Sequence, residues 1–402
     1  MAPVPSPRFT RSRQGAVPFG AAPRRSRWQK GAAVAGGIAA ASVLAAQAAA
    51  PAVPAYREFK DWIVACDNVR RCEARLAPAT GDTLPMRLLV ARESGPAGAV
   101  DLELAGEKPL APDAVRLDGS PLGGADRPAS AGSAWTTDGE GSYRLQGEPG
   151  LKLARRLEQS RQMAVQQPDG PLQLSLDGLA AALLFIDDVQ GRVGTVTALH
   201  QPGTGAPSQV PAAPALPVVQ AAAAPPPLPQ AAAFAASVRA RNAALLARRC
   251  DAPGAAAAGA LADDAMPLTG TDALVLLQCW SGAYQTAALV LRVPRAAPQQ
   301  ARAVALPEVP GGLPAGKNDD PGVVTEAFYD PATATLSSFA KGRGIGDCGI
   351  ARAWVFDGTA FQPASRDEQR RCAGSPGDWP ALYRTRSVPA AAPAAPLPVP
   401  VP

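Results

Sequence analysis

The residues Phe59-Lys60-Asp61-Trp62-Ile63-Val64-Ala65-Cys66, with Cys72 to Leu76 returning after a short turn, decide the fold of the first part of the chain. β-branched and aromatic residues precede Asp67-Asn68, a pair typical of turns, so this stretch predicts a β-hairpin. If the pairing is symmetric about Val69, Cys66 lies opposite Cys72, and every second residue of both strands shares their face. We expect that face to be core, with a disulfide closing the hairpin.

The chain holds six cysteines in 402 residues, and none lies in its first 48 residues. An even number of cysteines behind an export signal predicts three disulfides formed in an oxidising compartment. A Pro/Ala-rich stretch separates the first two cysteines from the other four, so the first two are expected to pair. The other four allow three pairings. We favour nearest neighbours, which gives Cys66 with Cys72, Cys250 with Cys279, and Cys348 with Cys372.

The first 48 residues resemble a secretory signal peptide. A basic region (Arg24, Arg25, Arg27 and Lys30) precedes an uncharged apolar stretch, 31–46, and Ala46-Gln47-Ala48 is a small-x-small cleavage site. The apolar stretch is nearly as long as the roughly 20 residues of a membrane span, but its Ala and Gly content argues against a retained anchor. Arg24-Arg25 also allows twin-arginine export, although the residues after the pair favour the general secretory route. We expect cleavage, a periplasmic location and no membrane span in the mature chain.

The formal net charge of +5 belongs to the leader. Residues 1–48 contain seven Lys or Arg and no acid, which leaves 32 basic against 34 acidic residues in the remainder. The mature chain is therefore almost neutral, and the usual inference from a basic protein to nucleic acid or anionic lipid has no basis. We expect no nucleic acid among its partners.

Composition divides the mature chain into two domains. Residues 201–233 consist mainly of Pro, Ala, Gly and Val, too poor in large apolar groups to build a core, and predict a semi-rigid, disordered linker. The flanking segments, 55–200 and 234–388, each have the size of one compact domain. A second Pro/Ala segment, 389–402, is expected to be a disordered tail.

We predict an α+β fold with two domains, each mainly an antiparallel sheet with one or two helices, stabilised by disulfides. In the first domain, further strands are expected at 86–92, 100–104 and 173–176, and helices at 151–161 and 179–187. In the second domain, a helix at 234–250 is expected to precede strands at 273–280, 286–293, 323–329, 335–340, 354–358 and 383–385.

Three separated stretches carry a resemblance to a known family: Phe59 to Cys72, Asp187 to Arg192, and Lys341-Gly342-Arg343-Gly344-Ile345-Gly346-Asp347-Cys348-Gly349. In this order they resemble the bacterial six-cysteine family called domain of unknown function 1176. The resemblance covers about residues 55–388 and implies an exported protein with no established activity. The first hairpin alone is also similar to the invasion-associated locus B family, over too short a stretch to imply a function.

Arg343 and Asp347 are candidates for a binding site. They lie in a glycine-rich stretch whose exposed N–H groups could bind an anion, with Arg343 holding a carboxylate or phosphate. A glycine-rich turn ahead of a disulfide is the alternative. We favour the turn because no Lys-Ser/Thr pair follows, as a phosphate-binding P-loop requires.

Asp187, Asp188 and Arg192 form the second candidate group. Adjacent carboxylates could bind a cation or supply an acid and a base, but a helix end followed by Gly191 explains the same residues as structural, and we favour that interpretation. Four tryptophans could form a stacking platform for sugars or peptides, although core packing is the commoner use of this residue. They are Trp135, Trp280, Trp354 and Trp379.

The sequence favours a protein without catalytic residues, metal or cofactor. His200 is the only histidine, so a Ser-His-Asp triad or a histidine-based metal site lacks partners, and no Cys-x-x-Cys pair suggests redox exchange. We predict a non-catalytic binding or structural factor of the periplasm or cell envelope, whose partner is an unknown envelope ligand or protein. One alternative is an envelope hydrolase that uses Asp187, Asp188 or Asp347 as acid or base. Another is a clamp, in which the linker lets both domains hold one polymer such as peptidoglycan.

Overall fold

The computed structural model describes residues 51–389, apart from 107–108, 112, 124–125, 127, 129–131, 140, 168, 251–261, 313–319 and 378. The predicted signal peptide, 1–48, and residues 390–402 of the predicted tail lie outside the described residues.

The predicted hairpin is part of an antiparallel sheet whose described strands run in the order β1-β2-β3-β4-β5-β9-β8. Cys66 lies opposite Cys72 and Trp62 opposite Leu76, so the register is symmetric about Val69, as predicted. A smaller antiparallel sheet has the order β11-β10-β6-β7. The strands are β1 (Ala55–Phe59), β2 (Trp62–Cys66), β3 (Cys72–Leu76), β4 (Met86–Arg92), β5 (Val100–Gly106), β6 (Val115–Leu117), β7 (Ser120–Pro121), β8 (Thr136–Thr137), β9 (Ser142–Gln146), β10 (Met163–Gln167) and β11 (Gly170–Leu174).

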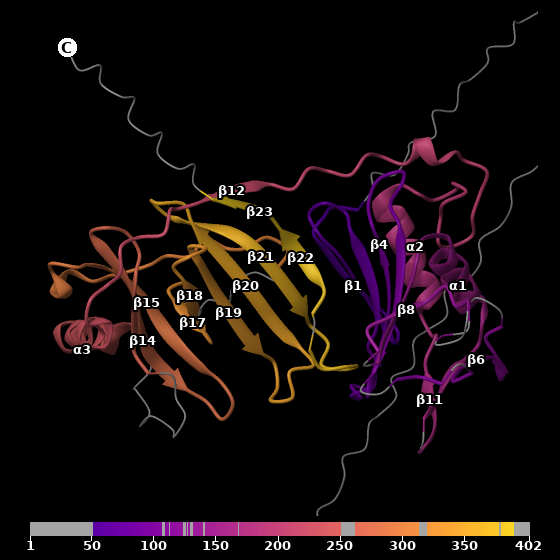
Figure 1. Ribbon diagram of the computed structural model, residues 1–402, viewed down its shortest axis with the longest axis horizontal. Helices are drawn as coiled ribbons and strands as arrows, with labels where there is room; N and C mark the ends of the chain where they lie inside the picture. The colour runs from indigo at the N-terminus through magenta and orange to yellow at the C-terminus, as the bar shows by residue number, and fades with distance from the viewer. Residues whose placement is uncertain are drawn as a thin grey trace, which may run out of the picture. The chain divides into compact units, whose positions relative to one another are not determined.

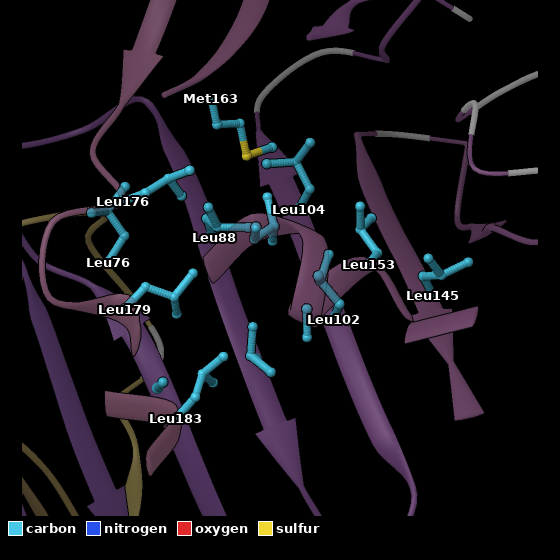
Figure 2. Close-up of a cluster of buried hydrophobic side chains, with 14 of the residues drawn as sticks. Leu76, Leu88, Leu102, Leu104, Leu145, Leu153, Met163, Leu176, Leu179 and Leu183 are labelled. Carbon is cyan, nitrogen blue, oxygen red and sulfur yellow. The ribbon is translucent and has the colours of Figure 1, made fainter. Parts of the chain in front are cut away.

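Two helices, α1 (Gly147–Gln159) and α2 (Leu179–Gln190), pack on one face of the larger sheet. Figure 2 shows leucines of β4 and β5 pointing toward leucines of both helices, and these side chains are almost fully buried. Gly178 precedes α2 with a φ of +97°, and a Cβ there would lie 1.9 Å from the carbonyl oxygen of Phe59. Only glycine therefore lets α2 start this close to the sheet.

Both faces of β2 are buried, whereas the sequence predicted only the face that carries Trp62, Val64 and Cys66 to be core. All five residues of the strand are buried. Trp62 and Val64 face the helices, whereas Ile63 and Ala65 belong to a second cluster that includes Leu382 from the far end of the chain. The continuous apolar run of β2 thus reflects a sheet covered on both sides.

The second part of the chain contains two further antiparallel sheets, with the orders β13-β14-β15-β16, where β17 also pairs with β15, and β18-β19-β20-β21-β22. Figure 1 shows β19 to β22 side by side. Two short helices, α3 and α4, replace the single predicted helix because the chain breaks at Asn242. The elements are η2 (Pro207–Gln209), β12 (Val218–Ala221), α3 (Ala231–Arg241), α4 (Ala243–Arg249), β13 (Asp264–Pro267), β14 (Asp272–Ser281), β15 (Thr286–Pro294), η3 (Pro298–Gln300), β16 (Arg302–Ala303), β17 (Val323–Thr325), β18 (Phe328–Asp330), β19 (Thr335–Lys341), β20 (Gly349–Phe356), β21 (Phe361–Gln369), β22 (Ala381–Arg384) and β23 (Arg386–Pro389).

The Pro/Ala segment 201–233 is ordered where a disordered linker was predicted. β12 pairs in parallel with β23, and the Ala222 N–H donates to the carbonyl of Phe356 at 2.8 Å. The side chain of Arg295 donates to the carbonyls of Pro226 and Pro227. These bonds form because a segment that cannot build a core of its own still offers backbone groups to its neighbours.

The fold class is confirmed as α+β with mainly antiparallel sheets in two sets, one or two helices with each, and three disulfides. The disulfides are Cys66–Cys72, Cys250–Cys279 and Cys348–Cys372, as nearest-neighbour pairing predicted. By their contacts, the described residues belong to one compact unit, so the boundaries 55–200 and 234–388 stay a prediction. Among the described helices, none is long and apolar enough to cross a membrane.

Removing a disulfide should cost more stability when the loop that it closes is longer. Cys250 and Cys279 are 29 residues apart, whereas Cys66 and Cys72 are six apart. Loop-closure entropy gives about 3.6 kcal/mol for the first and about 2.4 kcal/mol for the second. Urea unfolding of the Cys250→Ala/Cys279→Ala and Cys66→Ala/Cys72→Ala variants measures the two losses in free energy of unfolding. A larger loss for the Cys66–Cys72 variant would contradict this order and assign the stabilisation to packing around the buried hairpin.

Candidate functional site

Arg343 and Asp347 come together in the loop between β19 and β20. The Gly342 N–H donates to Cys348 O at 2.8 Å and the Gly346 N–H to Arg343 O at 2.9 Å, which closes the loop as a turn. Arg343 donates to both carboxylate oxygens of Asp347, with its Nε 2.8 Å from Oδ1. The two residues therefore form a bidentate ion pair within the loop.

Arg343 also bonds to two other segments of the chain, although its side chain is 41% exposed. Its Nη2 donates to the carbonyls of Cys372 at 3.1 Å and Gly81 at 3.2 Å. Close by, Gly374 N donates to Asp82 O and Leu84 N donates to Gly374 O. Arg343 thus links its own loop to Cys372 in the segment between β21 and β22 and to Gly81 in the segment between β3 and β4.

Asp347 is fully buried beside the Cys348–Cys372 disulfide. Its carboxylate and the two sulfurs lie within 4.8 Å of one another, a spacing that could serve a metal ion. Both sulfurs are joined in the disulfide, however, and thiolates are the form that binds metals. The carboxylate is occupied by Arg343, so these three residues serve the fold in the oxidised protein.

Asp187 and Asp188 point to different surroundings at the end of α2. Asp187 is fully buried and accepts hydrogen bonds from Leu199 N at 2.9 Å and His200 N at 2.8 Å. Asp188 is exposed. Successive helical residues diverge by about 100°, so the two carboxylates do not converge on one ion.

Arg192 is fully buried just beyond α2. It donates to Gln190 Oε1 at 2.7 Å, Thr197 Oγ1 at 3.1 Å and the carbonyls of Glu93 and Gly95. This network fixes the chain after α2 against the end of β4. Among the described residues, no hydrogen bond or ion pair joins this group to Arg343 or Asp347.

The surroundings of Asp187 disfavour its charge. Burial raises the pKa of this carboxyl to about 6, although the N–H groups of Leu199 and His200 and two nearby guanidinium groups oppose the shift. The guanidinium groups belong to Arg92 and Arg192. Burial and the charge of Arg192 lower the pKa of Arg92 to about 10.

Arg92 is a buried charged residue that sequence motifs did not indicate. Its side chain is 3% exposed, and its Nε has no hydrogen-bond partner among the described residues. The signal was the strand pattern: Met86, Leu88, Val90 and Arg92 alternate on one face, so the arginine continues a row of core residues.

His200 and the candidate tryptophans make contacts within the protein. His200 Nδ1 lies 2.8 Å from Glu158 Oε2 of α1. Trp135, Trp354 and Trp379 are buried, and the indole of Trp354 donates to Pro307 O at 2.8 Å. Trp280, the fourth candidate, is partly buried and packs against the cluster formed by β14, β15 and α3, so the four tryptophans contribute to core packing.

These observations define a disulfide-bonded α+β protein in which Asp187, Arg192 and Asp347 are buried and hydrogen-bonded within the chain. The family model described as "Protein of unknown function (DUF1176)" matches residues 56–386, and the chain belongs to this family. It is similar to the uncharacterized protein YpfG of Escherichia coli (strain K12), with 33% identity over 355 residues, 83% of this chain and 94% of that protein. No solved structure matches this chain.

Asp187 should make stability depend on pH. Its folded pKa of about 6 exceeds the unfolded value, so its contribution is complete below about pH 4 and is lost as the pH rises through about 6. Asp187→Asn imitates the protonated form. Relative to wild type, this variant should gain about 3 kcal/mol in free energy of unfolding between about pH 4 and pH 7, measured by urea unfolding.

Asp188→Asn is the matched control for this measurement. It changes the adjacent, exposed carboxylate and controls for the loss of one charge at the end of α2. A constant difference for Asp187→Asn would contradict the raised pKa.

Proposed function

We propose that this chain is an exported protein of the periplasm or cell envelope that acts as a binding or structural factor without catalysis. The observation that carries this proposal is the pairing of all six cysteines in three disulfides. Stable disulfides are typical of oxidising compartments. The signal-peptide pattern of residues 1–48 supports the same location, with cleavage after Ala48.

The state of the carboxylates supports a non-catalytic role over an envelope hydrolase. Asp187 and Asp347 are fully buried, and their oxygens accept hydrogen bonds from the chain itself. A general acid or base must reach the proton that it transfers. Asp188 is exposed, but among the described residues no second carboxylate or nucleophile is hydrogen-bonded to it.

The pairing of β12 with β23 bears on the clamp alternative. A clamp of two domains gains affinity when a linker allows both to reach one polymer. Because β12 is hydrogen-bonded to β23 and Ala222 to Phe356, the segment does not act as a free tether over those residues. We therefore propose a single binding protein rather than two independent modules.

Export should depend on the apolar stretch of the leader. Leu44→Arg places a charge in residues 31–46 and should leave an uncleaved, reduced precursor in the cytoplasm. Cell fractionation with mass spectrometry under non-reducing conditions measures location, N-terminus and disulfides together. Leu216→Arg, an exposed position beyond the leader, is the matched control and should be exported normally. Oxidised, cleaved protein from the Leu44→Arg variant in the periplasm would contradict the proposal.

The hydrolase alternative has its own test. Purified wild-type protein should release no fragments from peptidoglycan, and Asp187→Asn and Asp347→Asn should behave identically to it. Release that disappears in a folded Asp187→Asn or Asp347→Asn variant would contradict a non-catalytic role.

A further inference from the structure

A groove of about 630 Å³ lies on the exposed face of β18 and β19. Ala221–Ala224, the end of β12 and the residues after it, form one wall. The register pairs Phe328 with Ser337 and Asp330 with Thr335, so these four side chains stand on the same face. Its volume is within the range of about 300–1,000 Å³ for small-molecule sites. The strands β12, β18 and β19 are labelled in Figure 1.

Four hydroxyl side chains line this groove, and three of them, all except that of Ser387, donate hydrogen bonds within the protein. Thr333 donates to Asp330 Oδ2 at 2.7 Å, Thr335 to the carbonyl of Thr333 at 3.2 Å, and Ser337 to the carbonyl of Phe328 at 3.3 Å. A hydroxyl has one proton and two lone pairs, so each of these oxygens keeps free acceptor capacity. The groove therefore offers acceptors to a ligand that brings its own donors.

The charge of the groove excludes polyanions. None of its described lining residues is Lys, Arg or His, and its charged member is Asp330. Hydrogen bonds from the Thr333 hydroxyl and the Ala332 N–H lower the pKa of Asp330, which keeps it ionised. Because these two donors already stabilise the carboxylate, no cationic ligand is needed to balance it.

An aromatic ring borders the groove. Phe328 is 64% exposed, more than any other large hydrophobic residue among those described. It also borders a second hollow of about 120 Å³, which Tyr329 lines. The Tyr329 hydroxyl is buried and has no hydrogen-bond partner among the described residues. The ring thus stands between two hollows, and a flat apolar surface is available for stacking.

We propose that this groove binds an uncharged saccharide chain. Sugar hydroxyls supply the donors that Thr333, Thr335 and Ser337 lack, and the C–H face of a sugar ring matches the exposed ring of Phe328. A Pro-rich peptide fits less well because proline has no N–H donor. The proposal rests on the non-catalytic binding role given above and names its ligand class.

Calorimetric titration of the full oxidised protein with maltoheptaose, cellohexaose and chitohexaose tests the groove. At least one should bind, and Phe328→Ala should weaken that binding about tenfold or more, because burying a Phe ring is worth 1.5–3 kcal/mol and 1.4 kcal/mol is tenfold. Thr335→Val, which removes one acceptor at similar volume, should weaken it severalfold.

Phe339→Ala is the matched control, since Phe339 is 40% exposed on β19 but does not line the groove. It should bind as wild type does. Urea unfolding of each variant separates a binding loss from a folding defect.

Three results would overturn the proposal: no binding of any of the three saccharides, binding that Phe328→Ala leaves unchanged, or preference for polygalacturonic acid or for a synthetic peptide with the sequence of residues 390–402. Export and disulfide formation are measured separately by fractionation. The failure of this site would therefore leave the proposed location intact.

Discussion

The buried carboxylate of Asp67 is the interaction on which the arrangement of the sheets depends. It lies inside the loop closed by the Cys66–Cys72 disulfide, where it accepts hydrogen bonds from Val69 N at 3.0 Å and Arg71 N at 2.9 Å. Its counter-charge is Arg384 of β22, more than 300 residues further along the chain. Burial raises the pKa of Asp67, so the ionised form needs all three donors. The turn at 67–71, the Cys66–Cys72 disulfide and the distant strand β22 therefore stabilise one another.

That contact explains why β2 is buried on both faces. Asn68, beside Asp67, also binds the backbone of Arg384, accepting from its N–H at 2.8 Å and donating to its carbonyl at 3.0 Å. With β22 held at the hairpin turn, Leu382 packs against Ile63 and Ala65. Arg343 makes a second link of this kind through Gly81. The compact unit formed by the described residues follows from these long-range links, each placed beside a disulfide.

The sequence could predict what depends on neighbours along the chain and not what depends on distant partners. Alternation and turn residues are local, which is why the β2–β3 register, strands such as β4 and the pairing of adjacent cysteines were predicted correctly. The order of 218–221 was missed because its partner, β23, lies more than 160 residues away and a strand composed of Val, Gln and Ala has no strong pattern of its own. For the candidate residues, the motif showed that Arg343 and Asp347 were neighbours, but not that the arginine would also donate to the carbonyls of Gly81 and Cys372.

Charged motif residues are therefore a poor guide to a ligand site in this fold. A carboxylate or guanidinium that is buried must be paired within the protein, so its capacity to bind anything else is already used. Asp347, Asp187 and Arg192 all meet this description, and the partly exposed Arg343 is the ion-pair partner of Asp347. Free hydrogen-bonding capacity remains instead on the small hydroxyl side chains of β19, which no motif marks and which three distant segments bring into one groove. In a chain whose charges are used for folding, recognition is expected where polar atoms keep unused lone pairs beside an exposed aromatic ring.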